Sequence, residues 1–341
     1  MIYGNLGNSG LISSRLIFGT MTFNLGAEWM PGIASVGQAA ATDMVAACLD
    51  AGINHFDTAD GYSQGESEIA LGKALGRRRD DAIITTKYGF RNGDPITRSG
   101  LSRRHTIRSV EASLNRLGTD CIDVLIIHKE DFTTPLEETL HTLDDLIRAG
   151  KLRYVGVSNW PAWRVARAVQ YQQDNHMSQF IAGQMLYNLV VRDVEDDMLP
   201  MMREMGLGLM AWSPLAGGLL TGKYDPANLS ASEGRLQGGD FLGTPVDAAK
   251  AAIETLRDIA AAHKSEPAQI ALAWALAQGP SVFPIIGASR MPHLTSAITA
   301  ASLALTSKDM DQLDAIAPPA RRYPTWFTDF TADEVHKKHL T

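Results

Sequence analysis

The chain has 341 residues, of which 45% are hydrophobic and 20% charged, a composition that excludes a disordered, collagen-like or coiled-coil protein. Its 31 basic and 38 acidic residues give a formal net charge of −7, which argues against a nucleic-acid-binding surface. No apolar stretch approaches the roughly 20 residues of a membrane span, and the first residues lack the features of a signal peptide. We therefore expect a cytoplasmic protein with no membrane contact. The two cysteines, Cys48 and Cys121, lack metal-binding spacing and are expected to be reduced structural thiols.

Short apolar or β-branched runs alternate with longer amphipathic segments along most of the chain, which is typical of repeated βα units around a parallel sheet. In chain order the expected strands are Leu16–Gly19, Asn54–Asp57, Ala82–Lys87, Asp123–Ile127, Tyr154–Val157, Ile181–Gln184, Gly208–Ala211 and Val282–Ile286. Helical spacing of apolar residues predicts helices at Ala39–Ala51, Glu66–Gly76, Arg103–Leu117, Leu136–Ala149, Ala162–Gln172, Val194–Met205 and Asp247–His263. The longer interval before the last strand indicates an insertion.

Eight strands with intervening helices predict a (β/α)8 TIM barrel, an α/β fold that holds residues 1–341 in a single domain. The leading segments Met1–Tyr3 and Leu11–Ser13 are expected to form an N-terminal β-hairpin that closes the barrel bottom. A doubly wound open sheet is the alternative, but no GxGxxG follows the first strand, where the chain reads Phe18-Gly19-Thr20-Met21. The spacing of apolar residues gives no prediction for the segment after Ala320.

Ionisable side chains stand at the carboxyl ends of three successive strands, where TIM barrels carry their chemistry. These are Asp57, Lys87 and His128, and Tyr62 follows Asp57 by five residues on the same rim. Taken singly, each has an ordinary structural explanation as a cap, a solvated charge or a satisfied histidine. Taken together they form an acid–base device: the carboxylate keeps the ammonium charged, and the ammonium helps the phenol to give or take a proton. This pattern predicts general acid chemistry at a carbonyl group.

Five motifs in order, between about Leu6 and Leu305, resemble the aldo-keto reductase superfamily. They are Phe56-Asp57-Thr58-Ala59-Asp60-Gly61-Tyr62-Ser63-Gln64-Gly65-Glu66-Ser67-Glu68, Thr86-Lys87, Ile127-His128, Gly156-Val157-Ser158-Asn159 and Trp212-Ser213-Pro214-Leu215-Ala216-Gly217-Gly218-Leu219-Leu220-Thr221-Gly222-Lys223-Tyr224. The resemblance implies that Asp57, Tyr62, Lys87 and His128 are the family's catalytic tetrad. It also implies reduction of a small-molecule aldehyde or ketone by a nicotinamide cofactor, NADPH/NADP+, which lies across the rim without a Rossmann fold.

The resemblance implies cofactor contacts at the strand ends and in the loop after the seventh strand. Amide and hydroxyl groups suit a carboxamide, an indole ring suits stacking on the nicotinamide, and a glycine-rich loop suits a pyrophosphate under a long covering segment. The expected contacts are Thr20, Met21, Asp57, Ser158, Asn159, Gln184, Trp212, Ser213, Pro214, Leu215, Gly217, Lys223 and Arg235, with Gly238 and Gly239 as a further hinge.

After the last strand, Gly287, Ser289 and Arg290 open a helix near Pro292, and His293 follows within its first turn. A helix N-terminus with a hydroxyl and a guanidinium favours a phosphate, here the adenosine 2′-phosphate of NADPH. The chain departs from the family in this helix, because Ser296 and Ala297 replace the usual Glu-Asn pair. That departure leaves the adenine contacts and the strictness for NADPH over NADH undetermined.

The rim loops predict an apolar or aromatic substrate mouth, with Trp29, Phe90 and Trp160 as candidate substrate contacts, and Phe23 and Met30 beside them. The physiological carbonyl compound, the direction of the reaction and the oligomeric state stay open at this point.

Three other functions compete with a reductase. Potassium-channel β-subunits resemble the same family and serve chiefly as partners, although His128 beside Tyr62 favours turnover. A Schiff-base enzyme using Lys87 is disfavoured, since Asp57 would keep the amine protonated. A hydrolytic metal site is weaker still: His55 with Asp57, or His336 with His339, supplies fewer than three convergent ligands.

Overall fold

The structure is a computed structural model that describes residues 1–30, 33–223, 243–320 and 322–333. Parallel strands close into an eight-stranded barrel in the order β10-β3-β4-β5-β6-β7-β8-β9. The strands are β3 Ile17–Gly19, β4 His55–Asp57, β5 Ile83–Tyr88, β6 Ile122–Ile127, β7 Leu152–Ser158, β8 Phe180–Leu186, β9 Gly208–Trp212 and β10 Val282–Gly287. Each matches an expected strand to within a few residues, and the barrel excludes the doubly wound alternative.

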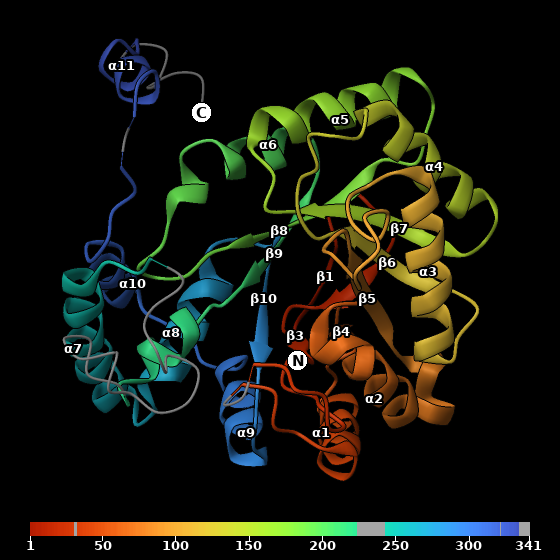
Figure 1. The fold of residues 1–341 in the computed structure, drawn as a ribbon. Helices are drawn as coiled ribbons and strands as arrows, with labels where there is room; N and C mark the ends of the chain where they lie inside the picture. Colours follow the sequence, from red (N-terminus) through yellow and green to blue (C-terminus); the bar gives the residue numbers. More distant parts are fainter. Residues whose placement is uncertain (31–32, 224–242, 321, 334–341) are drawn as a thin grey trace.

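Helices surround the barrel, apart from α11, which projects away from it (Figure 1). They are α1 Gln38–Asp50, α2 Glu66–Leu75, α3 Arg103–Leu117, α4 Leu136–Arg148, α5 Ala162–Asp174, α6 Met198–Glu204, α7 Val246–His263, α8 Pro267–Ala277, α9 Met291–Ala300, α10 Ser307–Asp314 and α11 Thr325–Phe330. Local signals set their ends: α3 begins where Ser102 accepts a hydrogen bond from the His105 amide, and it ends at Gly118, whose φ of 65° suits glycine. No helix of the described residues is long and apolar enough to cross a membrane.

An antiparallel hairpin of β1 Tyr3–Asn5 and β2 Ile12–Ser14 precedes the barrel, as the sequence predicts. Its turn carries Leu6, which is fully buried in the cluster of side chains inside the barrel. Gly7 has a φ of +61°, and a Cβ there would lie 2.2 Å from the Ile181 carbonyl oxygen. The close backbone approach that only glycine permits therefore seats the hairpin against the barrel.

The sixth helix is shorter than the sequence predicts. Instead of one helix over Val194–Met205, a 3-10 turn at Asp193–Glu195 is followed by α6 at Met198–Glu204. Pro200 explains the break, because proline has no backbone N–H and fits only the first turn of a helix.

Helices α8, α10 and α11 were not predicted. In α8, Ile270, Ala271, Leu272, Ala273, Trp274 and Ala275 are all buried, so the helix has no polar face to produce an amphipathic period. Its start does carry a signal that the periodicity missed: Pro267 at the first position, and the Gln269 side chain accepting the Glu266 amide.

Candidate active site

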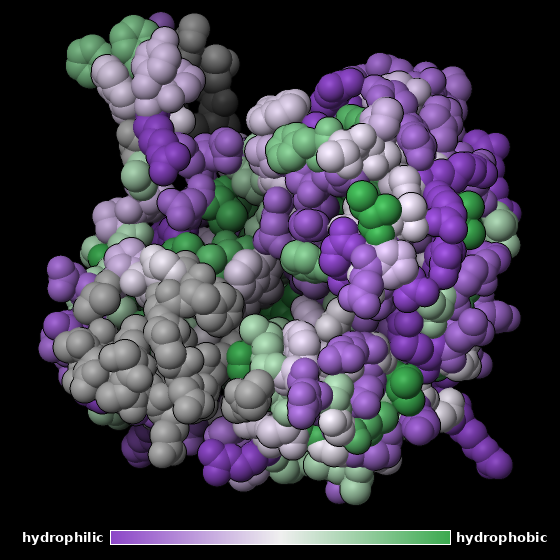
Figure 2. Space-filling view, in the orientation of Figure 1, coloured by the Kyte–Doolittle hydropathy of each residue, from purple (hydrophilic) through white to green (hydrophobic). Residues whose placement is uncertain are grey.

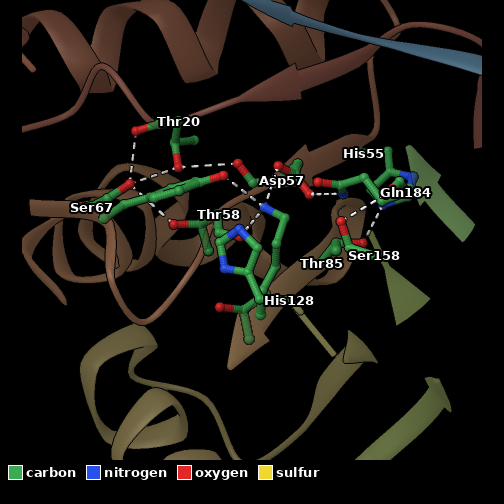
Figure 3. A network of polar contacts seen from close by, with 12 residues as sticks. Thr20, His55, Asp57, Thr58, Ser67, Thr85, His128, Ser158 and Gln184 are labelled. Carbon is green, nitrogen blue, oxygen red and sulfur yellow. Dashed lines mark hydrogen bonds and ion pairs between the residues drawn. The ribbon is translucent and has the colours of Figure 1, made fainter. Parts of the chain in front are cut away.

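Three polar side chains meet at the carboxyl-terminal end of the barrel: Asp57 from β4, Lys87 from β5 and Tyr62 from the loop that follows β4. The Lys87 Nζ atom donates to Asp57 Oδ2 at 2.7 Å, to the Thr58 carbonyl oxygen at 2.7 Å and to the Tyr62 hydroxyl at 3.1 Å. Neighbouring strands bring Asp57 and Lys87 together, since Asp57 pairs with Thr85, two residues before Lys87. Asp57 occupies the centre of this polar network (Figure 3).

The ion pair keeps Lys87 charged. Its side chain is fully buried, and burial alone would lower the pKa of the ammonium. The Asp57 carboxylate and the Tyr62 oxygen raise that pKa, and the net direction is upward. Burial raises the pKa of Asp57, while the Lys87 ammonium and the Gln184 amide oppose that rise. A positive charge therefore lies beside the Tyr62 hydroxyl at neutral pH.

His128 completes the group from the end of β6. Its ring lies 5.9 Å from the Tyr62 ring and 4.6 Å from the Phe90 ring, edge-on to both. Burial, and then the nearby Lys87 charge, hold the pKa of His128 well below its usual value. The imidazole is therefore neutral at pH 7, a state in which one ring nitrogen donates and the other accepts a hydrogen bond.

Polar groups from three further strands continue the site. Gln184 Nε2 donates to Asp57 Oδ1 at 2.8 Å, and the Ser158 hydroxyl donates to the Gln184 carbonyl oxygen at 2.7 Å. Asn159 Nδ2 donates to the His128 carbonyl oxygen at 3.0 Å, and its Oδ1 accepts from Trp212 Nε1 at 3.2 Å. Strands β4 to β9 are thus tied together around one rim.

These groups border a cavity of about 1410 Å³. Figure 2 shows this face of the molecule hollowed near its centre, with hydrophobic side chains visible in the hollow. The volume exceeds the roughly 300–1000 Å³ typical of small-molecule pockets. Most of the predicted cofactor residues line it: Met21, Asp57, Ser158, Asn159, Gln184, Trp212, Ser213, Pro214, Leu215, Gly217, Lys223, Gly287, Ser289, Arg290 and His293.

Basic groups gather where the cavity meets the start of α9. Burial, then the charges of Arg290 and Lys223, lower the pKa of His293, and Glu266 acts in the opposite direction. Arg290 is the N-cap residue of α9, so the positive end of the helix dipole adds to the same field. The cluster repels further positive charge and suits a bound phosphate.

The structure departs from several predicted contacts. Trp160 does not line the cavity: it is 3% exposed and packs edge-on against Phe180. Asn159 explains this, because its φ of 58° turns the chain so that the next side chain enters the core. Thr20 is also buried away from the cavity, with its hydroxyl on the Asp57 carbonyl oxygen and the Ser67 hydroxyl.

One smaller expectation also fails. Phe23 is fully buried against Phe18 and does not reach the substrate mouth. The Gly217 amide donates to the Ser213 hydroxyl at 2.9 Å and so closes its own turn at the cavity wall. Arg235, Gly238, Gly239, His336 and His339 lie outside the described residues.

Two charged residues of the cavity wall were missed. Arg91 follows Phe90 on the β5–α3 loop, and Glu266 begins α8 opposite Ser296. The Ser296 hydroxyl donates to Glu266 Oε2 at 2.5 Å, so a carboxylate from α8 lies where the resemblance would place the Glu-Asn pair of α9. The capping signal at the N-terminus of α8 could have identified Glu266.

Both ring nitrogens of His55 are hydrogen-bonded within the protein. Its Nδ1 contacts the Ser13 hydroxyl at 2.8 Å and its Nε2 contacts the Thr85 hydroxyl at 2.7 Å. Burial lowers the pKa of His55 to about 3, so the ring is neutral and both nitrogens are occupied by hydroxyl groups. Within residues 1–30, 33–223, 243–320 and 322–333, no three His, Cys, Asp or Glu side chains converge as metal ligands.

A second buried carboxylate, Asp60, lies behind the ion pair. Its Oδ2 has no hydrogen-bond partner, and burial, followed by the Glu68 carboxylate, raises its pKa to about 7. Glu68 itself accepts from the Thr86 hydroxyl and from Arg116 Nε, each at 2.5 Å. Asp60 therefore has fewer hydrogen bonds to its carboxylate than Glu68, and its ionisation destabilises the folded protein more.

We expect Asp60→Asn to stabilise the protein at alkaline pH. A carboxyl whose pKa is raised by folding stabilises the native state when protonated, and this contribution is lost as the pH rises from about 4 through 7. The variant escapes that loss and should gain on the order of 2–4 kcal/mol over the wild type at pH 8 and little near pH 4. Denaturant unfolding across this pH range measures the difference. The exposed Asp43→Asn change on α1 is the control, and equal pH profiles for wild type and Asp60→Asn would refute the assignment.

The comparisons with known proteins identify the family of this chain. The model of the aldo/keto reductase family matches residues 15–318, and the chain belongs to that family. It is 32% identical to the versiconal hemiacetal acetate reductase of Aspergillus parasiticus, over 95% of this chain and 99% of that protein.

Two further relatives have different assigned roles. A protein of Schizosaccharomyces pombe assigned as an aryl-alcohol dehydrogenase is 33% identical over 92% of this chain and 95% of its own length. A protein of Oryza sativa subsp. japonica assigned as a voltage-gated potassium channel subunit beta is 35% identical over 93% and 96%. The family thus includes reductases and proteins assigned as channel subunits, and the residues of the site have to distinguish between these roles.

Proposed function

We propose that this protein is an NADPH-dependent carbonyl reductase that converts an aldehyde or ketone to the corresponding alcohol. The observation that carries the proposal is the Tyr62 hydroxyl, 3.1 Å from the Lys87 ammonium at the wall of the large cavity. Nicotinamide, when bound, would supply a hydride to the carbonyl carbon. The carbonyl oxygen then needs one proton, and the protein must provide it.

Tyr62 is the proposed proton donor. As negative charge develops on the carbonyl oxygen, the phenol gives up its proton, and the Lys87 ammonium stabilises the phenolate that remains. Asp57 keeps Lys87 charged and is held in turn by Gln184. Neutral His128, beside Tyr62, orients the carbonyl by a hydrogen bond from its ring N–H.

The residues present fit a dinucleotide. Trp212 lines the cavity at the end of β9, and Ser158 and Asn159 line it at the end of β7, where they suit a nicotinamide ring and its carboxamide. At the other end, Lys223, Arg290 and His293 form a cluster of basic groups that suits the adenosine 2′-phosphate. That cluster favours NADPH over NADH.

Steady-state assays test the function directly. The purified protein should oxidise NADPH in the presence of simple aliphatic and aromatic aldehydes, with alcohol formed in equal amount. The rice relative favours a second candidate, a cofactor-binding accessory module with little turnover. Tight NADPH binding without oxidation by any tested aldehyde, ketone or quinone would support that module and contradict the reductase.

Arg290→Ala tests the choice of cofactor. Charge-assisted hydrogen bonds are typically worth about 1.5–3 kcal/mol, so the change should weaken NADPH binding by roughly tenfold to a hundredfold. NADH has no 2′-phosphate and should bind the variant almost as well as the wild type. Fluorescence titration of both cofactors measures this. Equal weakening of the two would mean that Arg290 supports α9 in general, and an unchanged constant for NADPH would contradict a phosphate contact at Arg290.

A further inference from the structure

We propose that the substrates of this site are aromatic aldehydes or ketones that carry an anionic group, and that Arg91 binds this group. The inference rests on the proposed reductase function and extends it to a substrate class. It depends on which side chains form the wall of the cavity that Tyr62 shares.

The wall next to the reacting position is aromatic. The Trp29 ring lies 5.9 Å from the Tyr62 ring, and the Phe90 ring lies 4.6 Å from the His128 ring. Both side chains line the cavity, and Phe90 is 43% exposed. A planar ring bearing the carbonyl would cover this apolar surface while its oxygen faces Tyr62 and His128.

The residue that follows Phe90 in the chain adds a positive charge to the wall of the cavity. Arg91 is exposed and lines the same cavity. Its Nη1 atom donates to the carbonyl oxygens of Gly93, Asp94 and Pro95 at 3.4, 3.4 and 3.1 Å, so the loop backbone holds one side of the guanidinium. No ion pair of the described residues involves Arg91, and a guanidinium has further N–H donors that suit a carboxylate.

The acidic residues of the cavity wall are engaged elsewhere. Asp57 is paired with Lys87, and Glu266 is hydrogen-bonded to Ser296 at the adenosine end. The described part of the substrate end therefore presents positive charge without a competing carboxylate in the wall. An anionic ring substituent would meet Arg91, whereas a cationic one would be repelled.

The test compares 3- and 4-formylbenzoate with their methyl esters, which have the same ring and aldehyde but no charge. We expect kcat/KM for at least one acid to exceed that of its ester by about tenfold or more in the wild type, mainly through KM. Arg91→Gln should remove this advantage by lowering kcat/KM for the acid far more than for the ester, and Arg91→Lys should keep part of it. Arg98→Gln, on the same loop but outside the cavity wall, is the matched control.

Binding without turnover gives a second readout. Fluorescence titration of the NADPH-loaded protein with 4-(hydroxymethyl)benzoate, a pair with no hydride acceptor, should show weaker binding in Arg91→Gln than in Arg98→Gln and the wild type. Equal kcat/KM for acids and esters in the wild type would overturn the inference while leaving the reductase intact. If aliphatic aldehydes are reduced but acids, esters and plain benzaldehyde are not, the inference fails and the reductase stands; if no aldehyde, ketone or quinone is reduced, the proposed function itself fails.

Discussion

Tyr62→Phe should abolish most of the reductase activity and leave the cofactor site intact. The change removes one oxygen, keeps the ring that contacts Trp29, and deletes the proton donor. General acid catalysis typically contributes about 10²–10⁴-fold, so kcat should fall by that factor, while the dissociation constant for NADPH should stay within about twofold. Steady-state kinetics and cofactor titration on the same preparation measure the two quantities.

Tyr3→Phe is the control for this experiment. Tyr3 lies in the hairpin at the opposite end of the barrel, where its hydroxyl donates to the Gly52 carbonyl oxygen at 2.8 Å. Its loss should leave kcat at the wild-type level. If Tyr62→Phe turned over like the Tyr3 variant, the proton would have to come from another group, and His128 would be the next candidate.

Lys87→Met should also suppress catalysis, and for an electrostatic reason. The change removes the positive charge 3.1 Å from the Tyr62 hydroxyl, so the phenolate formed on proton transfer loses its stabilisation. We expect kcat to fall by roughly a hundredfold or more, with the pH optimum displaced. Asp57 would be left buried without its cation, a loss that typically costs about 3–5 kcal/mol and is relieved at low pH by protonation of Asp57.

Two measurements separate this role from others. Lys73→Met removes an exposed lysine of α2 and should leave kcat and the unfolding profile unchanged. Borohydride added to the wild type with an aldehyde should leave no covalent adduct at Lys87 by mass spectrometry, since Asp57 keeps the amine protonated. An adduct at Lys87 would instead support Schiff-base chemistry.

The barrel was predictable because its strands and helices repeat a strong local pattern, and the acid–base group because its members stand at strand ends. The β3–β10 strands were recognised since each is a short apolar run between turn signals. Helix α8 was not, because it is buried on every side and shows no period of 3.6 residues. Its capping residues Glu266 and Gln269 would have revealed it to a search based on helix ends.

The loop residues that line the cavity were harder to predict than the acid–base residues at the strand ends. Residue type alone did not distinguish Trp160, which enters the core, from Phe90, which faces the cavity. For Trp160 the direction follows from the positive φ of the preceding residue, Asn159. Arg91 was overlooked since a single arginine in a polar loop has no spacing pattern. Such positions depend on loop geometry, which local sequence signals constrain less than they constrain strands and helices.

The bond between Gln184 and Asp57 joins β8 to β4 across the barrel interior, so the Asp57–Lys87 pair that supports the proton donor is fastened to the sheet, while Tyr62 itself lies on the turn after β4. The residues that would select a substrate, Trp29 and Phe90 with Arg91, belong to loops that leave the barrel after β3 and β5. Grafting the β5–α3 loop from a relative should therefore exchange the preferred carbonyl compound without a second round of mutations to restore the acid–base geometry. The β3–α1 loop is less separable, because the Ser63 hydroxyl beside Tyr62 donates to its Phe23 carbonyl oxygen. For engineering, this means that the loop after β5 can be exchanged to change the substrate while the acid–base residues are kept.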